Sequence, residues 1–248
     1  MRQLKVLAFL FLVPAPVHAQ VAGKFPPDSL VNTKVIPHDT PVREVVGTMR
    51  NISQGLGVRC PFCHVGKEGE PLSQFDFPSD QKRNKRVARE MMWMVQEINH
   101  RIDTIPDRPS PGVTVNCRTC HRGVSRPVPL ETIVTEATLA GGADSGTRVY
   151  RSLRDRFFGR DAYDFGENSL DGAALQVAQK GKADEALHLL SLNEGFFPGS
   201  SRVAVLRGDV LLMRADTAAA AAAFREALRR DSTDGEAMAR LRAIGAGR

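Results

Sequence analysis

Cysteine and histidine recur together at two places in the first half of this 248-residue chain. Residues 60–64 read CPFCH and residues 117–121 read CRTCH, so both follow the pattern C-x-x-C-H and together they use all four cysteines. In this pattern two thiols bond covalently to a porphyrin and the adjacent histidine ligates its iron, which is the attachment chemistry of haem c. The sequence therefore predicts two haem c groups, attached through Cys60, Cys63, Cys117 and Cys120 and ligated by His64 and His121.

Other uses of two cysteine pairs explain less of this pattern. Four thiols can hold a structural zinc ion, and paired thiols in an oxidising compartment can form disulfides or a redox motif. None of these sites requires a histidine directly after each pair. The repetition of the whole motif favours haem over all three.

The residues before the first motif predict the helix that positions it. Residues 39–41 read DTP, a typical helix start, and apolar side chains then recur at helical spacing until a glycine at 55 or 57 ends the helix. Met49 belongs to this apolar stripe. Because the helix leads straight into residues 60–64, it can fold back over a porphyrin, and Met49 is the predicted ligand on the far side of that iron.

A second helix is predicted from residue 79 to about residue 102, with Ser79-Asp80 as its N-cap. Its apolar stripe includes Met91 and Met94, and Met92 lies between them. Each of these three sulfur atoms is a possible ligand for the second iron. The residues alone leave Met91 and Met94 equally suitable.

Three stretches of the first half carry a specific resemblance. Residues 49–64, 88–99 and 115–123, within a region from about 38 to 128, resemble the haem-binding region of the cytochrome c subunit of photosynthetic reaction centres. The resemblance implies that each iron takes its histidine from C-x-x-C-H and its sixth ligand from a methionine on the preceding helix. The implied ligand pairs are Met49 with His64, and Met91 with His121.

The chain also departs from that family. The family subunit carries four haems, and this chain has motifs for two, so it corresponds to half of the family pattern. Many members are lipid-anchored, whereas no cysteine follows the predicted export signal here to carry an anchor. The family ligates a further haem through a histidine after the second helix, and His100 lies too early for that role. The resemblance therefore implies cofactor and ligands, and leaves the pathway open between photosynthesis and respiration.

The first 19 residues predict the compartment. They contain a basic start, an apolar run at 6–13 and small residues before Gln20, which is the pattern of a cleaved secretory signal. This run is too short to span a bilayer, and no later stretch has the ~20 apolar residues that a transmembrane helix needs. We expect a mature protein in the periplasm, where haem c is attached in bacteria.

The charges are unevenly distributed along the chain. The formal net charge is +6, and it falls to +4 when Arg2 and Lys5 leave with the signal. Residues 20–128 hold 16 basic and 11 acidic side chains, whereas residues 129–248 hold 16 and 17. Because two haems bring four propionates, they offset most of the excess, and the basicity does not require a nucleic-acid partner. Part of it is consistent with a docking face.

The second half has a different pattern, which predicts helices and repeats. Residues 129–166 are expected to form a helical connector. Windows 167–200 and 201–234 share a period of 34 residues that resembles the tetratricopeptide pattern, and residues 235–244 are expected to form a capping helix. Such helix pairs stack into a concave surface that docks a partner, for example a membrane complex. The predicted domains are thus a signal (1–19), a di-haem domain (20–128), the connector and the repeats (167–248).

These features predict a mainly α-helical electron carrier, with a compact di-haem domain of helix-turn-C-x-x-C-H units and a short helical-repeat domain. Iron closed on both faces by His and Met has no open position, so it passes single electrons between redox proteins and is not expected to act as an enzyme. One alternative is a di-haem peroxidase, which needs an open sixth position. Another is a scaffold or assembly protein that acts through its repeats. If the methionines do not ligate, His38 and His100 are the next candidates.

Overall fold

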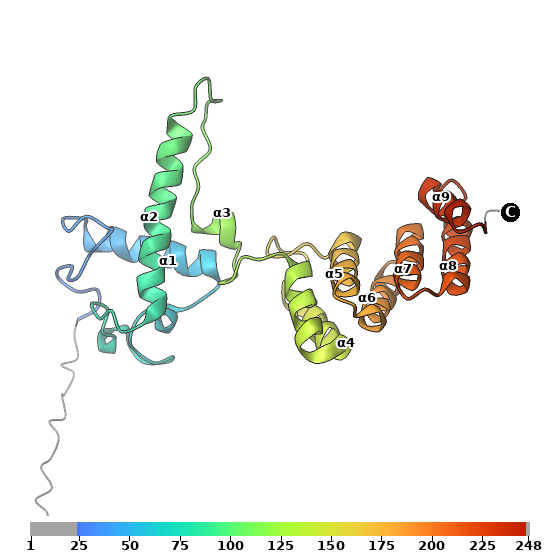
Figure 1. Cartoon of the computed structure of the whole chain (residues 1–248). Helices are drawn as coiled ribbons and strands as arrows, with labels where there is room; N and C mark the ends of the chain where they lie inside the picture. The colour runs from blue at the N-terminus through green and yellow to red at the C-terminus, as the bar shows by residue number, and fades with distance from the viewer. Residues whose placement is uncertain (1–23, 247–248) are drawn as a thin grey trace, which may run out of the picture. The chain divides into compact units, whose positions relative to one another are not determined.

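A computed structural model describes residues 24–246 of the chain. Within that range the protein is mainly α-helical, with nine α-helices, two 3-10 turns and no β-sheet (Figure 1). It contains two compact units: the first comprises the described residues up to Ser53 together with Val58–Val115, and the second comprises Gln54–Gly57 together with the residues from Asn116 on. The predicted signal at 1–19 lies outside the described residues, and the predicted domain limits stay predictions.

Helix α1 (Val42–Leu56) forms where the sequence predicts a helix before the first motif. The Pro41 carbonyl accepts its first hydrogen bond, from the Glu44 amide at 2.9 Å. At its other end Gly57 has φ +65, and the Val58 amide donates to the Ser53 carbonyl at 3.0 Å. This is a Schellman-type ending, in which a left-handed glycine terminates the helix. The expected stop at the glycines is therefore present.

Helix α2 (Arg83–Asp103) begins later than predicted. Its N-cap position is Lys82, which makes no side-chain capping bond, so the Ser79-Asp80 cap expected from the sequence is wrong. The Asp80 carboxylate is not available to the helix amides because it pairs with Lys85 at 3.1 Å and with Arg89 at 2.9 Å. Between α1 and α2 the chain forms two 3-10 turns, η1 (Cys60–Phe62) and η2 (Leu72–Gln74).

The second unit starts with a short helix and a long, interrupted one. Helix α3 (Cys117–His121) contains the second motif. Helix α4 (Leu130–Phe157) is broken at Gly141 and Gly142, where the backbone leaves helical geometry. A Cβ at Gly146 would lie 2.0 Å from the Thr138 hydroxyl oxygen, so the two halves of α4 approach closely across the break. Only glycine permits this contact.

Helices α5 to α9 follow one another, and each packs against its sequence neighbours (Figure 1). A Cβ at Gly208 on α7 would lie 2.3 Å from the ring of Phe224 on α8, which shows how closely that pair packs. The pairs α5–α6 and α7–α8 coincide with the two 34-residue windows, and α9 with the expected cap. Their assignment as tetratricopeptide repeats stays a prediction. The bounds are Glu167–Gln179 for α5, Ala183–Phe196 for α6, Ser201–Met213 for α7, Thr217–Arg230 for α8 and Gly235–Ala243 for α9.

The two units differ in how much apolar surface they bury. From Val124 onward the chain has continuous apolar clusters, and Tyr150, Leu170 and Phe224 are fully buried in them. In the first unit, by contrast, no described side chain is buried, and α1 and α2 do not pack closely against each other. The second unit therefore has a core of its own, whereas the first unit has none built from side chains alone.

Candidate haem sites

The first motif is folded as a single tight turn. Pro61 is the second residue of the 3-10 turn η1, and its fixed φ suits the first turn of a helix. The His64 amide donates to the Cys60 carbonyl at 2.9 Å, and the Cys63 amide donates to the same carbonyl at 3.2 Å. These bonds bring Cys60, Cys63 and His64 onto one turn of backbone, as attachment to one porphyrin requires.

Aromatic rings surround the histidine of this motif. The Phe77 ring contacts the His64 imidazole edge to face, with 4.9 Å between ring centroids, and Phe75 and Phe25 pack on Phe77. The contact of Phe77 with the imidazole was not predicted from the sequence. Gly66 permits this packing, since a Cβ there would lie 2.6 Å from the Phe75 ring.

Burial and nearby cations keep His64 neutral. Burial lowers its pKa most, the positive charge of Lys85 lowers it further, and the Phe77 backbone acts in the opposite direction. The Nδ1 atom is buried without a hydrogen-bond partner in the structure. Neutral imidazole is the form that ligates a metal, so the environment favours the role that the motif assigns to this side chain.

The second motif is folded as the short helix α3. Asn116 caps it: the side-chain oxygen accepts from the Arg118 amide at 2.9 Å and from the Thr119 amide at 3.3 Å. The Thr119 hydroxyl accepts in return from the Asn116 amide, which completes a capping box. Arg122 then takes a left-handed conformation, with φ 50, and ends the helix. The three functional side chains again lie within about one helical turn.

The imidazole of His121 has its orientation fixed. Its Nδ1 atom lies 2.9 Å from the Val124 carbonyl oxygen. A carbonyl only accepts, so Nδ1 carries the proton and Nε2 is left as the metal-binding nitrogen. In metal sites, the ring nitrogen of a histidine that does not bind the metal usually makes a hydrogen bond of this kind.

The end of α1 contacts the second motif directly. The Gly123 amide donates to the Gly55 carbonyl at 2.8 Å. A Cβ at Gly57 would lie 2.0 Å from the Gly123 carbonyl oxygen, so no larger residue fits there. The sequence shows these glycines, but spacing gives no sign that two turns far apart in the chain meet.

The four thiols are free in the structure. Cys60, Cys63 and Cys117 are half-buried and Cys120 is exposed. Burial raises the pKa of the Cys63 and Cys117 thiols. Each pair remains available for covalent attachment.

The predicted methionine ligands lie on α1 and α2, and the structure does not pair them with the histidines. Met49 is half-buried on α1, in the same unit as His64. Met91 and Met94 lie on one face of α2 and are 40% and 43% exposed. Met91 belongs to the first unit and His121 to the second, so their pairing, like that of Met49 with His64, stays a prediction. His38 and His100 are exposed.

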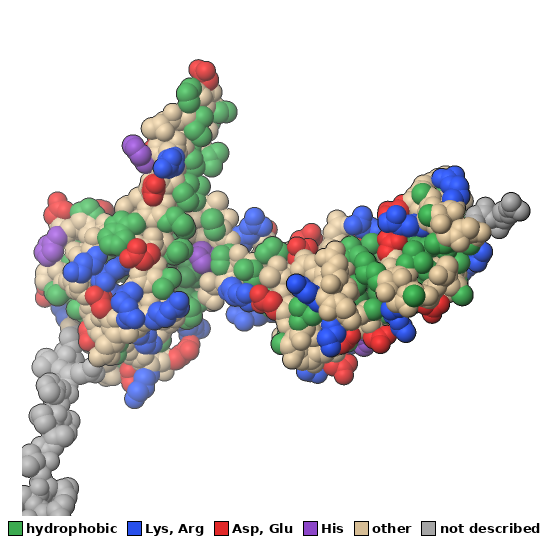
Figure 2. Space-filling model, in the orientation of Figure 1, with side chains coloured by type: hydrophobic (Ala, Val, Ile, Leu, Met, Phe, Trp, Pro, Cys, Tyr) green, Lys and Arg blue, Asp and Glu red, His purple; other side chains and the backbone are tan. Residues whose placement is uncertain are grey.

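The residues of the first unit fit a large apolar cofactor. Figure 2 shows hydrophobic side chains exposed along the surface that α2 forms. They include Val87 at 37% and Trp93 at 44% exposure, together with the two methionines, and no side chain in the unit is buried. Exposed apolar stripes of this kind usually mark a binding surface. Haem attached to neighbouring thiols is a group of suitable size and polarity.

Comparison with family models gives a match over part of the chain. Residues 68–152 match the model of the photosynthetic reaction centre cytochrome C subunit family. The resemblance predicted from the sequence is thereby confirmed. The reaction-centre cytochrome match includes the second C-x-x-C-H motif and extends into α4, while the first motif precedes it. Comparison with curated proteins gives no match.

The reaction-centre cytochrome match implies a haem electron carrier with redox protein partners, and the two C-x-x-C pairs are consistent with haem c. Of the helices between residues 24 and 246, none combines the length and the apolar run that crossing a bilayer requires. Over the same residues, no cluster of three or more His, Cys, Asp or Glu side chains has the arrangement of a metal-ion site.

Proposed function

We propose that this protein is a periplasmic di-haem c-type cytochrome that carries single electrons between redox proteins. One observation carries the proposal: each C-x-x-C-H motif is folded into one turn, η1 in the first and α3 in the second, that gathers its two thiols and its histidine. The match to the reaction-centre cytochrome family supports it. When bound, haem supplies the one-electron chemistry.

The side chains of this protein would determine how that chemistry is used. The four cysteines would hold the two porphyrins, and the imidazoles of His64 and His121 would ligate the irons. Met49 and Met91 are proposed for the opposite faces, where a thioether would raise the reduction potential relative to a second imidazole and close the iron to oxygen and peroxide. The apolar face of α2 would exclude water from the porphyrin that it covers.

Mass spectrometry and a redox titration of the purified exported protein test this proposal. We expect two covalent haems per chain, a mature N-terminus at Gln20, c-type absorption bands on reduction and no rapid turnover of peroxide. A colourless protein without covalent haem would end the proposal. Rapid peroxide turnover that is lost when His64 or His121 is replaced would point to a peroxidase instead.

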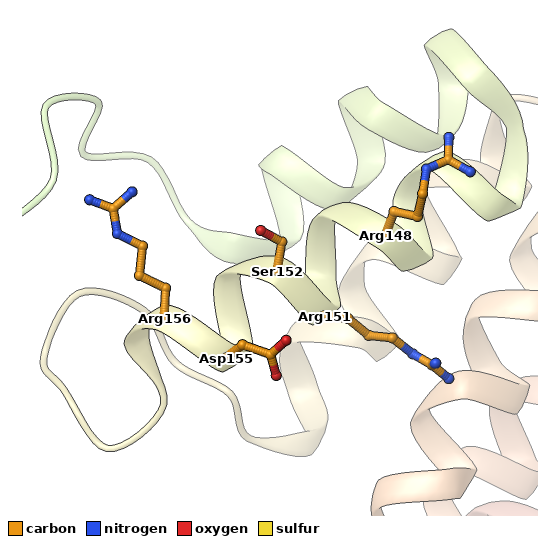
Figure 3. A pocket seen from close by; sticks show the side chains of 5 residues that line it. All are labelled: Arg148, Arg151, Ser152, Asp155 and Arg156. Atoms are coloured by element: carbon orange, nitrogen blue, oxygen red, sulfur yellow. The ribbon is translucent and has the colours of Figure 1, made fainter.

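The helical second half is proposed to dock a partner with an acidic surface. An open pocket of about 580 Å³ lies along the exposed face of α4, and Arg148, Arg151 and Arg156 line it together with Ser152 and Asp155 (Figure 3). Among the described residues these three arginines have no ion-pair partner. Arginines elsewhere in this unit, such as Arg202 and Arg240, do pair with carboxylates. Free guanidinium groups on one helix face suit carboxylates of an incoming protein.

Binding of a glutamate-rich peptide at low salt tests this docking surface. Exposed ion pairs contribute about 0.2–1 kcal/mol each, so the loss of two pairs in the R148E/R151E variant is expected to weaken binding roughly 2- to 30-fold. The matched control is R225E/R242E, which changes the net charge equally at exposed positions on α8 and α9. Equal weakening by both variants would show a general charge effect and remove the case for this pocket.

A further inference from the structure

Helix α2 contacts the first haem motif through its N-terminal end. The Lys82 ammonium donates a hydrogen bond to the Pro61 carbonyl, and the Asn84 side-chain amide donates to the Phe62 carbonyl at 3.1 Å. Pro61 and Phe62 are the two residues between Cys60 and Cys63. Two side chains at the start of α2 therefore hold the backbone that separates the two thiols.

The same helix holds the approach to the second motif near its C-terminal end. The Asn99 amide nitrogen donates to the Val115 carbonyl at 2.8 Å, and the Asn99 amide oxygen accepts from the Val115 amide at 2.8 Å. Val115 directly precedes Asn116, the residue that caps the helix of the second motif. The Asn99 side chain thus bonds both the amide and the carbonyl of Val115, because it offers a donor and an acceptor together.

The two contacts are separated along a rigid element. At 1.5 Å per residue, Asn84 and Asn99 lie roughly 22 Å apart along α2, about four turns. Loss of one contact therefore leaves the other in place. Cys60 and Cys63 lie in a unit without a buried side chain, so hydrogen bonds to the segment between them are a means of fixing these two thiols before porphyrin is attached.

We propose that α2 positions the two attachment sites independently: Lys82 and Asn84 set the first C-x-x-C turn for covalent attachment of haem, and Asn99 sets the second. This inference rests on the proposed haem function. It assigns positioning roles to three polar residues outside both motifs.

Site-resolved haem occupancy tests the inference. The full-length exported protein is digested, and mass spectrometry measures the fraction of peptide 60–64 and of peptide 117–121 that carries haem. The K82A/N84A variant is expected to lower occupancy at the first peptide by about fivefold or more, which is the effect of losing two hydrogen bonds. The N99A variant is expected to lower occupancy at the second peptide alone.

Three further samples make the result decisive. N99D keeps the acceptor and loses the donor, so it is expected to fall between N99A and wild type, and Q96A is an exposed control on the same helix. Full occupancy at both peptides in every variant, or equal loss at both peptides in each, overturns the proposed roles while leaving the di-haem function intact. Wild-type protein without haem on either peptide would instead defeat the function itself.

Discussion

Preventing haem attachment is expected to unfold the first unit and spare the second. Replacing all four cysteines by serine removes the covalent links. Ordering each backbone residue costs roughly 1–2 kcal/mol, whereas burying an aliphatic side chain returns about 1.5–3 kcal/mol. The first unit has no buried side chain to offset this entropy cost, whereas the second has continuous apolar clusters that do.

The size of the effect follows from helix lengths. Helix α1 has 15 residues and α2 has 21, so their loss is expected to remove roughly a quarter of the helical circular dichroism signal. Hydrogen exchange resolves the location: amides of α1 and α2 should exchange quickly, and those of α5 to α8 should stay protected. Wild-type chain produced without a haem supply is the matched control for the serine substitutions. Wild-type-like protection of α2 in haem-free protein would refute the reasoning.

Three other predictions concern single side chains. Replacing Met49 or Met91 by alanine should lower the potential of one haem or open it to carbon monoxide; unchanged potentials and no carbon monoxide binding would place the sixth ligands elsewhere. Hydrogen bonding to Arg89 holds the pKa of Asp80 far below its usual range, so the unfolded chain takes up this proton first and the stability that the carboxylate provides is present above about pH 4 and lost below it. An acid titration of the unfolding midpoint should therefore show a smaller fall in D80N than in wild type. In G57A the Cβ clash and the strain of a positive φ should cost about 1–3 kcal/mol in denaturant unfolding, and an unaltered midpoint would mean that the turn simply shifts.

Sequence reasoning succeeded where spacing determines geometry. Two thiols three residues apart with an adjacent histidine lie on one turn in both motifs, as η1 and α3 show. The end of α1 was also predictable, because a left-handed glycine stops a helix wherever it occurs. In these cases the determining interactions lie within a few residues of each other.

Sequence reasoning failed where a side chain had a competing partner. Asp80 has the right type and place for an N-cap, but Lys85 and Arg89 bind its carboxylate. The hydrogen bonds between Asn99 and Val115 and the contact of Phe77 with His64 join residues that no local pattern links. The choice between Met91 and Met94 stays open, because the two share one helical face and periodicity cannot rank them.

In the export proposed above, where the chain crosses a membrane with its N-terminus leading, the bond between Gly55 and Gly123 affects the order in which α1 is completed. The last turn of α1 emerges early, yet the amide that completes it is carried by a residue far behind. Until that residue has crossed, the carbonyl can bond only to water. The first described helix is therefore completed only when a residue near the middle of the chain has arrived.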